Sequence, residues 1–329
     1  MALVAVAFGA LLTACGNSNA TISASFSSPQ GMASVGNDLF VGNLSDNYVS
    51  DVNEESGAIV RNIQGATYRF NAPSYVCFDD GDLWVSNVEG NSITVLSRKT
   101  YAVVRVLSAK KYGLQGPNHI TCDGSVVIVA NYFGNSATIV SARTGALIRI
   151  TSGDPYRLQD PAGLSVTGGR AWILCSGSQS LTEIALPSGA FVRRITRAAG
   201  HFDDPAAIGG DGTHLWVASE GGVNGSVSEL SVTTGAFVRT ISGRASHLNQ
   251  PNGIASNGTS VWIASPVSKS GLVEIDASTG RIIRVLGAGI STPSANVLTS
   301  GNKVYVENGF DGVIYELEAS TGKLLHVIG

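Results

Sequence analysis

A proline that follows an apolar residue by three positions recurs at a nearly constant interval in seven copies, and this repeat constrains the fold more than any other feature. The repeated residues are Pro29, Pro73, Pro117, Pro161, Pro205, Pro251 and Pro293. The steps between them are 44, 44, 44, 44, 46 and 42 residues. A period in the forties is typical of a four-stranded propeller blade or of a two-helix solenoid repeat.

The residues after each proline distinguish these two architectures. Each copy continues with a β-rich run: LFVGN, LWVSN, VIVAN, AWILC, LWVAS, VWIAS or VYVEN. A polar turn, a third run such as NSITVLS, a Gly-containing turn in most copies and a fourth run such as GALIRI follow. β-branched and aromatic residues at alternating spacing, bounded by turn residues, indicate strands rather than helices. The sequence therefore predicts an all-β, seven-bladed β-propeller of four-stranded antiparallel blades, whose ring hides the sheet faces.

The repeats fill residues 26–329, which we expect to form a single propeller domain. Their approximate bounds are 29–72, 73–116, 117–160, 161–204, 205–250, 251–292 and 293–329. Because the chain ends just after a fourth run, we expect the ring to close without exchanging a strand between its termini, although TISASF (21–26) could add an edge strand. One bulky position per copy is expected to pack between blades, and it holds Phe40, Trp84, Ile128, Trp172, Trp216, Trp262 and Tyr305.

The N-terminal stretch MALVAVAFGALLTACG differs from the repeats because it carries no charged side chain. An apolar segment followed by small residues and Cys15 resembles the lipobox of bacterial lipoproteins. That resemblance implies a signal peptide over 1–14, acylation of Cys15, a tether over 15–25, and a lipid anchor at a membrane of the cell envelope. The alternative is an uncleaved or ordinary secretory leader. The stretch is shorter than the roughly 20 apolar residues of a membrane-spanning helix.

Three further cysteines, Cys77, Cys122 and Cys175, follow within the repeats. Their odd number leaves no complete disulfide framework, and none shows C-x-x-C spacing. We predict that they are small buried hydrophobic residues. A Cys77–Cys122 bridge in an oxidising compartment is the alternative.

Charge and motifs exclude several classes of function. A net charge of -3 argues against nucleic-acid binding, which requires a basic face. The sequence contains no G-x-S-x-G, P-loop or dinucleotide-binding motif, and no histidine pair at metal-binding spacing. Nucleophilic, nucleotide and cofactor chemistry therefore receive no support, and a monomer without cofactor is expected.

The runs LWVSN, VIVAN and VYVEN, with a following NSxTxI and a Thr-Gly turn, resemble the YVTN-type extracellular β-propeller repeat. NHL and virginiamycin-lyase-like propellers are similar but fit the runs less well. The resemblance implies an extracytoplasmic binding or surface protein. Copy four departs from it with AWILCSGSQS, and copy two has Tyr101 where other copies have Gly.

Propellers bind ligands at one end of the central channel, where the loops entering the innermost strands lie. The residues just after most of the prolines are small, as with Ala162-Gly163, Ala206-Ala207 and Ser294-Ala295. Larger polar residues occur at Tyr75, Asn118, His119 and Asn252, and we predict that these line a ligand site. Asp160 and Asp204, just before their prolines, are further candidates at the same end. The alternatives are hydrogen-bonded channel filling for the first group and turn capping for the aspartates.

A basic residue recurs four positions after each third-to-fourth-strand turn: Arg61, Arg105, Arg149, Arg193, Arg239, Arg284 and His326. A charged outermost strand prevents edge-to-edge pairing, so we interpret these residues as structural. Glu183, Glu229, Glu274 and Glu316 on the third strands are their expected partners. The alternative interpretation is a basic belt for an anionic polymer.

The sequence favours a lipid-anchored extracytoplasmic scaffold that binds a protein, peptide or glycan at its loop-rich end and has no catalysis of its own. The second hypothesis is a metal-dependent lyase or lactonase with its site at the channel mouth. Calcium would be its cofactor, and it would need several oxygen ligands converging on the channel.

Overall fold

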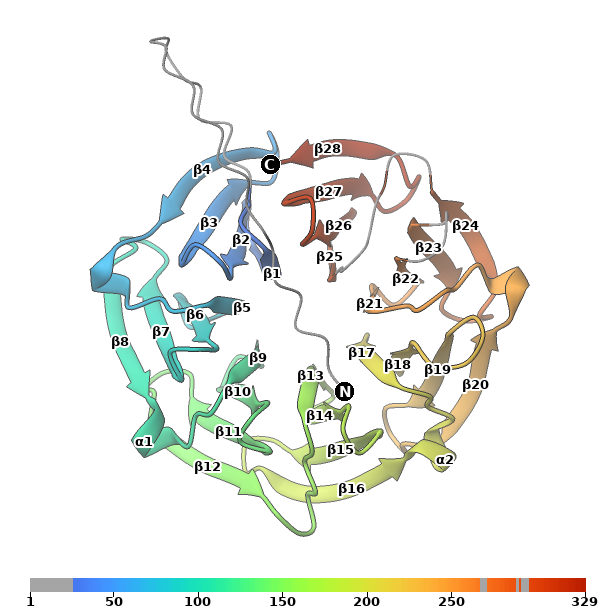
Figure 1. The fold of residues 1–329 in the computed structure, drawn as a ribbon, viewed down its shortest axis with the longest axis horizontal. Coiled ribbons are helices and arrows are strands. Elements are labelled where there is room, and N and C mark those ends of the chain that lie inside the picture. Colours follow the sequence, from blue (N-terminus) through green and yellow to red (C-terminus); the bar gives the residue numbers. More distant parts are fainter. Residues whose placement is uncertain (1–25, 267–270, 288–289, 291–295) are drawn as a thin grey trace.

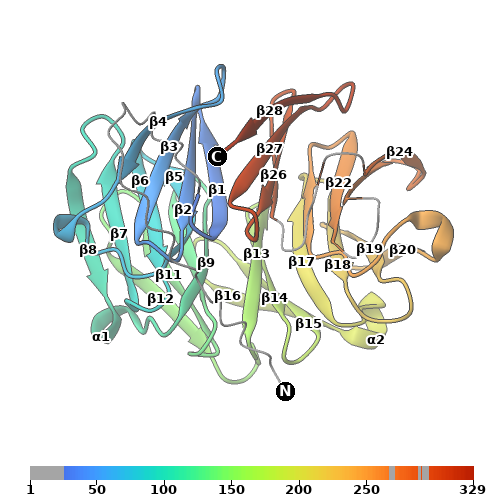
Figure 2. The ribbon, with the colours of Figure 1, turned by 45° about the horizontal axis from the view of Figure 1, so that its top comes forward.

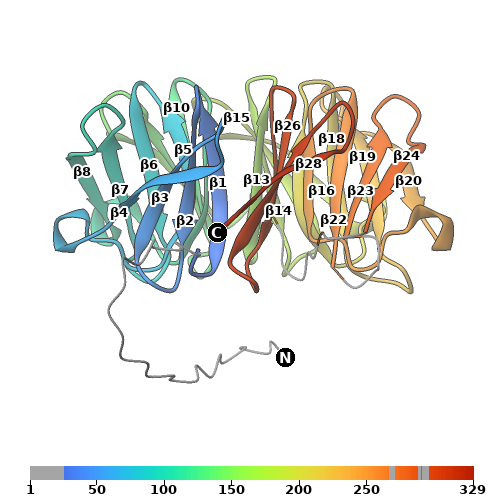
Figure 3. The same cartoon turned by 90° about the horizontal axis from the view of Figure 1, so that it is seen from above.

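The computed structural model describes residues 26–266, 271–287, 290 and 296–329. Seven four-stranded antiparallel sheets form a closed ring, and each sheet consists of four strands consecutive in the chain (Figure 1). The prediction of a seven-bladed β-propeller is therefore confirmed. Seen obliquely, the innermost strands surround the central axis (Figure 2), and from the side the strands span the thickness of the disc (Figure 3).

The innermost strands begin at the repeated proline in five blades, where the missing N–H and fixed φ of proline are tolerated. These strands are β1 (Pro29–Val35), β5 (Pro73–Asp79), β9 (Pro117–Cys122), β13 (Pro161–Thr167), β17 (Pro205–Gly210), β21 (Gly253–Ser256) and β25 (Val297–Ser300). The second strands are β2 (Asp38–Asn43), β6 (Asp82–Asn87), β10 (Val126–Asn131), β14 (Arg170–Cys175), β18 (His214–Ser219), β22 (Ser260–Ser265) and β26 (Lys303–Asn308).

The outer half of each blade contains the third and fourth runs of the repeat. The third strands are β3 (Tyr48–Asn53), β7 (Ser92–Ser97), β11 (Ser136–Ser141), β15 (Ser180–Ala185), β19 (Ser226–Ser231), β23 (Gly271–Asp276) and β27 (Val313–Glu318). The fourth strands are β4 (Ala58–Ile63), β8 (Val103–Ser108), β12 (Leu147–Ser152), β16 (Ala190–Thr196), β20 (Phe237–Ser242), β24 (Ile282–Leu286) and β28 (Leu324–Ile328).

Short helical turns occur in some loops that connect one blade to the next. They are η1 (Ala66–Tyr68), α1 (Ala109–Tyr112), α2 (Arg197–Gly200) and η2 (Arg244–Ser246). None of the helices in the described ranges has the length and apolar character needed to cross a bilayer.

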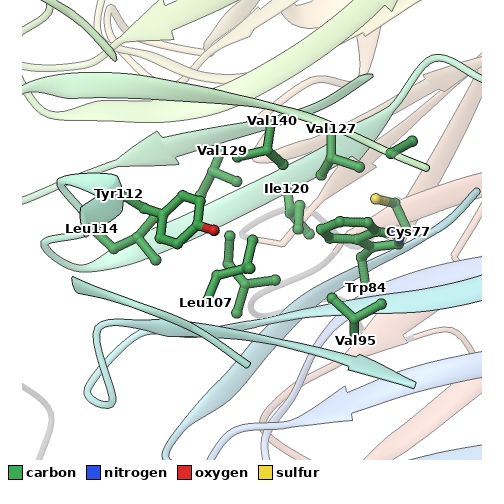
Figure 4. Packing of buried hydrophobic residues seen from close by; sticks show 12 residues of the cluster. Cys77, Trp84, Val95, Leu107, Tyr112, Leu114, Ile120, Val127, Val129 and Val140 are labelled. Atoms are coloured by element: carbon green, nitrogen blue, oxygen red, sulfur yellow. The ribbon is translucent and has the colours of Figure 1, made fainter. Parts of the chain in front are cut away.

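The hydrophobic core consists of clusters that lie between adjacent blades. Trp84 is fully buried and packs with Ile120, Val127 and Val129 of the next blade (Figure 4). The equivalent residues Phe40, Ile128, Trp172, Trp216, Trp262 and Tyr305 are all 0% exposed, as the sequence predicted. A large buried aromatic removes roughly 150–250 Å² from water. Contact between blades is therefore the main source of hydrophobic stabilisation in this ring.

The ring closes by side-by-side packing of the first and last blades. All four strands of each of these blades come from one continuous segment, so no strand is exchanged, as expected. The backbone N–H of Phe26 donates to the carbonyl of Gly312 at 3.1 Å, and the Phe26 side chain is buried against Ile314 and Ile328. The possible edge strand over 21–26 lies outside the described residues, except for Phe26.

The basic residues of the fourth strands are structural, as interpreted from the sequence. Arg193 and Arg284 form ion pairs of 2.6 Å with the buried carboxylates of Glu183 and Glu274. Arg284 also donates from Nη2 to the carbonyl of Ser320 in the next blade at 3.1 Å. These arginines therefore connect neighbouring blades, a role beyond the edge protection that the sequence suggested.

Tyr101, the departure in copy two, belongs to the same arrangement. It occupies the turn position at φ +57°, where other copies have Gly. The guanidinium of Arg61 lies 4.5 Å from its ring centroid, and its hydroxyl donates to Asp51 at 2.5 Å. In blade three the side chain of Arg105, from the preceding blade, packs against Gly145 at this turn position, whereas Arg61 makes a cation–π contact with Tyr101.

The cysteine prediction is wrong for two of the three residues. Cys77 and Cys122 form a disulfide that joins the adjacent innermost strands β5 and β9, with Cα atoms 5.8 Å apart. The odd number of cysteines did not prevent one bridge, because neighbouring innermost strands place side chains at bonding distance. Cys175 is free and buried, as predicted.

Candidate functional site

A cavity of about 460 Å³ occupies the central channel and is lined by residues of the seven innermost strands and their leading loops. Apolar side chains such as Met32, Ile120, Leu164, Ile208 and Ile254 line its wall together with polar side chains and backbone groups. Polar side chains concentrate at the ends of the strands where the chain enters the channel. The cavity therefore has a mixed polar and apolar lining, with its larger polar side chains at the entry end, which suits a small ligand or one protruding group.

One position in each blade defines this end, and we call the set the inner ring. Its members lie nine residues before the inter-blade aromatic position: Gly31, Tyr75, His119, Gly163, Ala207, Gly253 and Asn296. Six of them lie on the innermost strands, and Asn296 immediately precedes β25. Their neighbour on the second strand is the fourth residue of the β-rich run, as Ala207 pairs with Ala218 and His119 with Ala130. Only three of the seven residues have polar side chains, so the polar groups of the inner ring come from blades two, three and seven. We call this arrangement one-sided.

Tyr75 of blade two reaches across blade one toward blade seven. Its hydroxyl donates to Oδ1 of Asn296 at 2.7 Å. The path exists because Gly31 has no side chain, and a Cβ there would lie 2.7 Å from the Tyr75 ring. The Asn296 amide donates in turn to the backbone carbonyl of Gln30 and, at 3.4 Å, to the Glu307 carboxyl group.

His119 packs on the other side of Tyr75, with ring centroids 4.0 Å apart. Its Nδ1 is buried and has no hydrogen-bond partner among the described residues. The Oδ1 of Asn252, which lines the same cavity, is also buried and without a partner there. Unpaired buried polar atoms cost about 1–3 kcal/mol each, so these two mark positions where a ligand could donate or accept hydrogen bonds.

Burial shifts the pKa of each of three titratable groups at this end in the direction that favours its uncharged form. It lowers the pKa of His119 to about 4. Burial, with the nearby Glu307 as a smaller cause, raises the pKa of the Tyr75 phenol. Burial also raises the pKa of Glu307 well above its ordinary value, which favours the neutral acid. The site therefore presents neutral hydrogen-bonding groups rather than a charge.

The residues predicted from the sequence divide into two groups. Tyr75, His119 and Asn252 line the cavity. Asn118 is not part of its lining, and its Oδ1 accepts a hydrogen bond of 3.4 Å from Ser74. Cys15 lies outside the described residues, so its acylation stays a prediction.

The two aspartates also stay out of the cavity lining. Asp160 and Asp204 have left-handed backbone conformations with φ of 48° and 56°. The carbonyls of both accept hydrogen bonds from the following second-to-third-strand loop, from Ser176 and Glu220. These bonds involve the backbone and not the carboxylates, so turn capping by the aspartate side chains stays a prediction.

Asn296 and Glu307 also belong to the candidate site. The sequence analysis did not predict them, because it located site positions by their distance from the repeated proline. In six blades the proline and the aromatic position are 11 residues apart, whereas Pro293 and Tyr305 are 12 apart. Counting back from the aromatic position would have found Asn296 instead of Ser294-Ala295, which lie outside the described residues. Glu307 was also visible in VYVEN, because the same position is Gly42, Ser86, Ala130, Leu174, Ala218 and Ala264 in the other blades.

The site does not fit a resident metal ion. Within the described ranges, no group of three or more His, Cys, Asp or Glu side chains could hold one. Glu307 is buried and hydrogen-bonded to Asn296, and the Asp160 carboxylate packs against Gly177, away from the cavity lining. The calcium-dependent version of the enzyme hypothesis is therefore not supported by these side chains.

No family model matches the sequence, and no curated protein sequence matches it. Several solved structures share its fold. Virginiamycin B lyase from Staphylococcus aureus is similar over 86% of this chain and 92% of its own, with a TM-score of 0.70 and 14% identity.

Two further structures show the same likeness. A streptogramin B lyase is similar over 88% of this chain and 93% of its own, with a TM-score of 0.71 and 17% identity. Kuenenia stuttgartiensis hydrazine synthase covers 92% of this chain and 99% of its own, with a TM-score of 0.70 and 14% identity. At these identities the likeness establishes the propeller fold, and function has to be argued from the site itself.

Proposed function

We propose that this chain is a binding protein whose ligand inserts an uncharged hydrogen-bonding group into the polar end of the channel. The observation that carries the proposal is the one-sided inner ring, where Tyr75, His119 and Asn296 replace the Gly or Ala of the other blades. A few fixed polar groups in a partly apolar cavity are enough to orient a ligand. The loops around this end would contact the rest of the ligand, which we propose to be a protein, a peptide or a glycan.

Two features support an extracytoplasmic location for this binding protein. The Leu12-to-Cys15 segment resembles a lipobox. The Cys77–Cys122 disulfide is typical of oxidising compartments such as the bacterial periplasm or the cell surface. Together they favour a protein held by acyl chains on Cys15, since two chains give stable anchoring where one is marginal.

The test is binding to arrays of neutral oligosaccharides and short peptides by wild-type protein and by His119→Ala and Tyr75→Ala. We expect a bound probe whose signal falls at least about tenfold in both variants, as when hydrogen bonds in a desolvated pocket are lost. Undiminished binding by both variants, with unchanged melting temperatures, would place the site on the outer rim. Absence of any bound probe would count against a glycan or peptide ligand.

A lyase activity without a metal is the second candidate, and the neutral ring of His119 favours it. An uncharged imidazole can accept a proton, and the buried Nδ1 has no protein partner in the described ranges. Quinupristin, which one similar solved structure contains, is the appropriate substrate to test. If the chain consumes quinupristin and His119→Ala does not, catalysis replaces simple binding as the proposed function.

A further inference from the structure

A second cavity, of about 590 Å³, lies between blades three and four on the same end of the ring as the channel mouth. Its lining includes Asn135 from the β10–β11 loop, Asp154 and Arg157 from the segment before β13, and Arg194 from β16. Strands β12 and β16 form the outer edges of these blades (Figure 1). The cavity is therefore separate from the inner ring, and neither hypothesis about the channel accounts for it.

Arg194 breaks the repeat at this position. Its equivalents, matched by their pairing with the third strand, are Asn62, Val106, Ile150, Thr240, Val285 and Val327. All six lack a charge, so the fold does not require an arginine here. This distinguishes Arg194 from its neighbour Arg193, which belongs to the structural series present in nearly every blade.

A second departure in blade four holds Arg194 in place. In blades two and three, an asparagine amide at the end of the second strand donates to a serine of the third strand, as Asn131 does to Ser136 at 3.1 Å. Blade four has Cys175 at the asparagine position. The oxygen of Ser180 instead accepts a hydrogen bond of 3.1 Å from Nε of Arg194. The serine therefore orients the guanidinium at the cavity wall.

The charges lining this cavity leave Arg194 available to a ligand. Arg157 is paired with Asp154 at 2.5 Å, so these two largely neutralise each other. The Nη1 and Nη2 atoms of Arg194 form no hydrogen bond or ion pair with any residue in the described ranges. A guanidinium presents parallel N–H groups that match the two oxygens of a carboxylate. We propose that this cavity binds a carboxylate group, with Arg194 as its main contact.

The experiment titrates the folded domain with glucuronate, and with glucose as the neutral counterpart, while observing the Arg Nε–Hε signals by NMR. We expect saturable binding of glucuronate with a dissociation constant on the order of 1 mM, which is typical of one small contact. Glucose should give no saturable shift. Arg194→Thr, which installs the blade-five residue, should weaken glucuronate binding about tenfold or more.

Arg143→Thr is the matched control, because Arg143 is an exposed arginine in the β11–β12 turn, at the opposite end of the ring. It removes the same charge and should leave the affinity within about twofold. Equal binding by wild type and Arg194→Thr, equal losses in both variants, or saturable binding of glucose would each overturn the proposal. Absence of glucuronate binding by the wild type would overturn it as well. Ligand binding in the channel is independent of these outcomes.

Discussion

The inner ring and the contacts between blades are both built from equivalent positions of the seven repeats. The residue type varies much more between repeats in the inner ring than at the contacts between blades. Between blades, the aromatic position is bulky and fully buried in every copy. In the inner ring, the equivalent positions range from Gly31 and Ala207 to Tyr75 and His119. Positions that keep their character serve the ring itself. Positions that change from blade to blade are where a ligand can be recognised.

The largest expected effect on stability comes from the aromatic position between the blades, which is bulky in every repeat. Trp262→Ala should lower the free energy of unfolding by about 3–5 kcal/mol, because it leaves a cavity between blades six and seven. Trp262→Phe keeps most of the apolar volume and should cost distinctly less. Urea unfolding monitored by circular dichroism measures both variants. Small, equal effects would mean that the aromatic residues do not hold the blades together.

The disulfide should give the next largest effect. It closes a loop with a sequence separation of 45 residues between the innermost strands of blades two and three. Replacing Cys77 and Cys122 together by Ala should cost about 2–4 kcal/mol, mainly because the unfolded chain gains freedom. Comparison of the oxidised and reduced wild-type protein in urea is the control, and reduction should reproduce the loss. An unchanged transition midpoint in both experiments would exclude a stabilising role.

The arginine series allows a matched pair of variants. Arg239 forms an ion pair with the buried Glu229, and Arg239→Ala should cost about 2–3 kcal/mol, because it leaves the Glu229 carboxylate in the interior without its arginine partner. Arg149 lies opposite Ile139, and Arg149→Ala should stay within about 1 kcal/mol of the wild type. Both values come from the same denaturant titration. Similar losses of unfolding free energy in the two variants would show that pairing with a buried carboxylate does not add to the contribution of the arginine.

The pH dependence of stability tests the inner ring directly. Burial lowers the pKa of His119 to about 4, below the value of about 6.5 for an unfolded chain. The unfolded state therefore binds a proton first as the pH falls, and the His119 contribution to stability is lost between about pH 6.5 and 4. His119→Gln should show a flatter profile over this range. Identical pH profiles for the variant and the wild type would mean that the His119 side chain is exposed to solvent and not buried.

Much of the fold was predictable because each blade is built from local strand and turn signals that recur with one period. Two features required three-dimensional information. The sequence left the Cys77–Cys122 bridge open as one of two alternatives, and the 5.8 Å separation of the two Cα atoms decides between them. The contact of Arg284 with the Ser320 carbonyl depends on how far a fourth strand extends toward the next blade.

The site was predictable only in part, for a reason specific to blade seven. Tyr75, His119 and Asn252 were identified because they are large and polar where other copies are small. Asn296 was missed because blade seven has one more residue between its proline and its aromatic position. Strand pairing with the second strand sets the inner ring, and the proline only marks where the innermost strand begins in most blades.

The most direct test of this account is the free energy of unfolding of His119→Ala, which installs the residue found at Ala207. Loss of the ring contact with Tyr75 should cost about 0.5–1.5 kcal/mol, and removal of the unpaired buried Nδ1 should return about 1–3 kcal/mol. The variant should therefore be within about 1 kcal/mol of the wild type, or more stable. A loss of about 3 kcal/mol or more, comparable with Trp262→Ala, would show that His119 serves the fold and would contradict a ligand site in the inner ring.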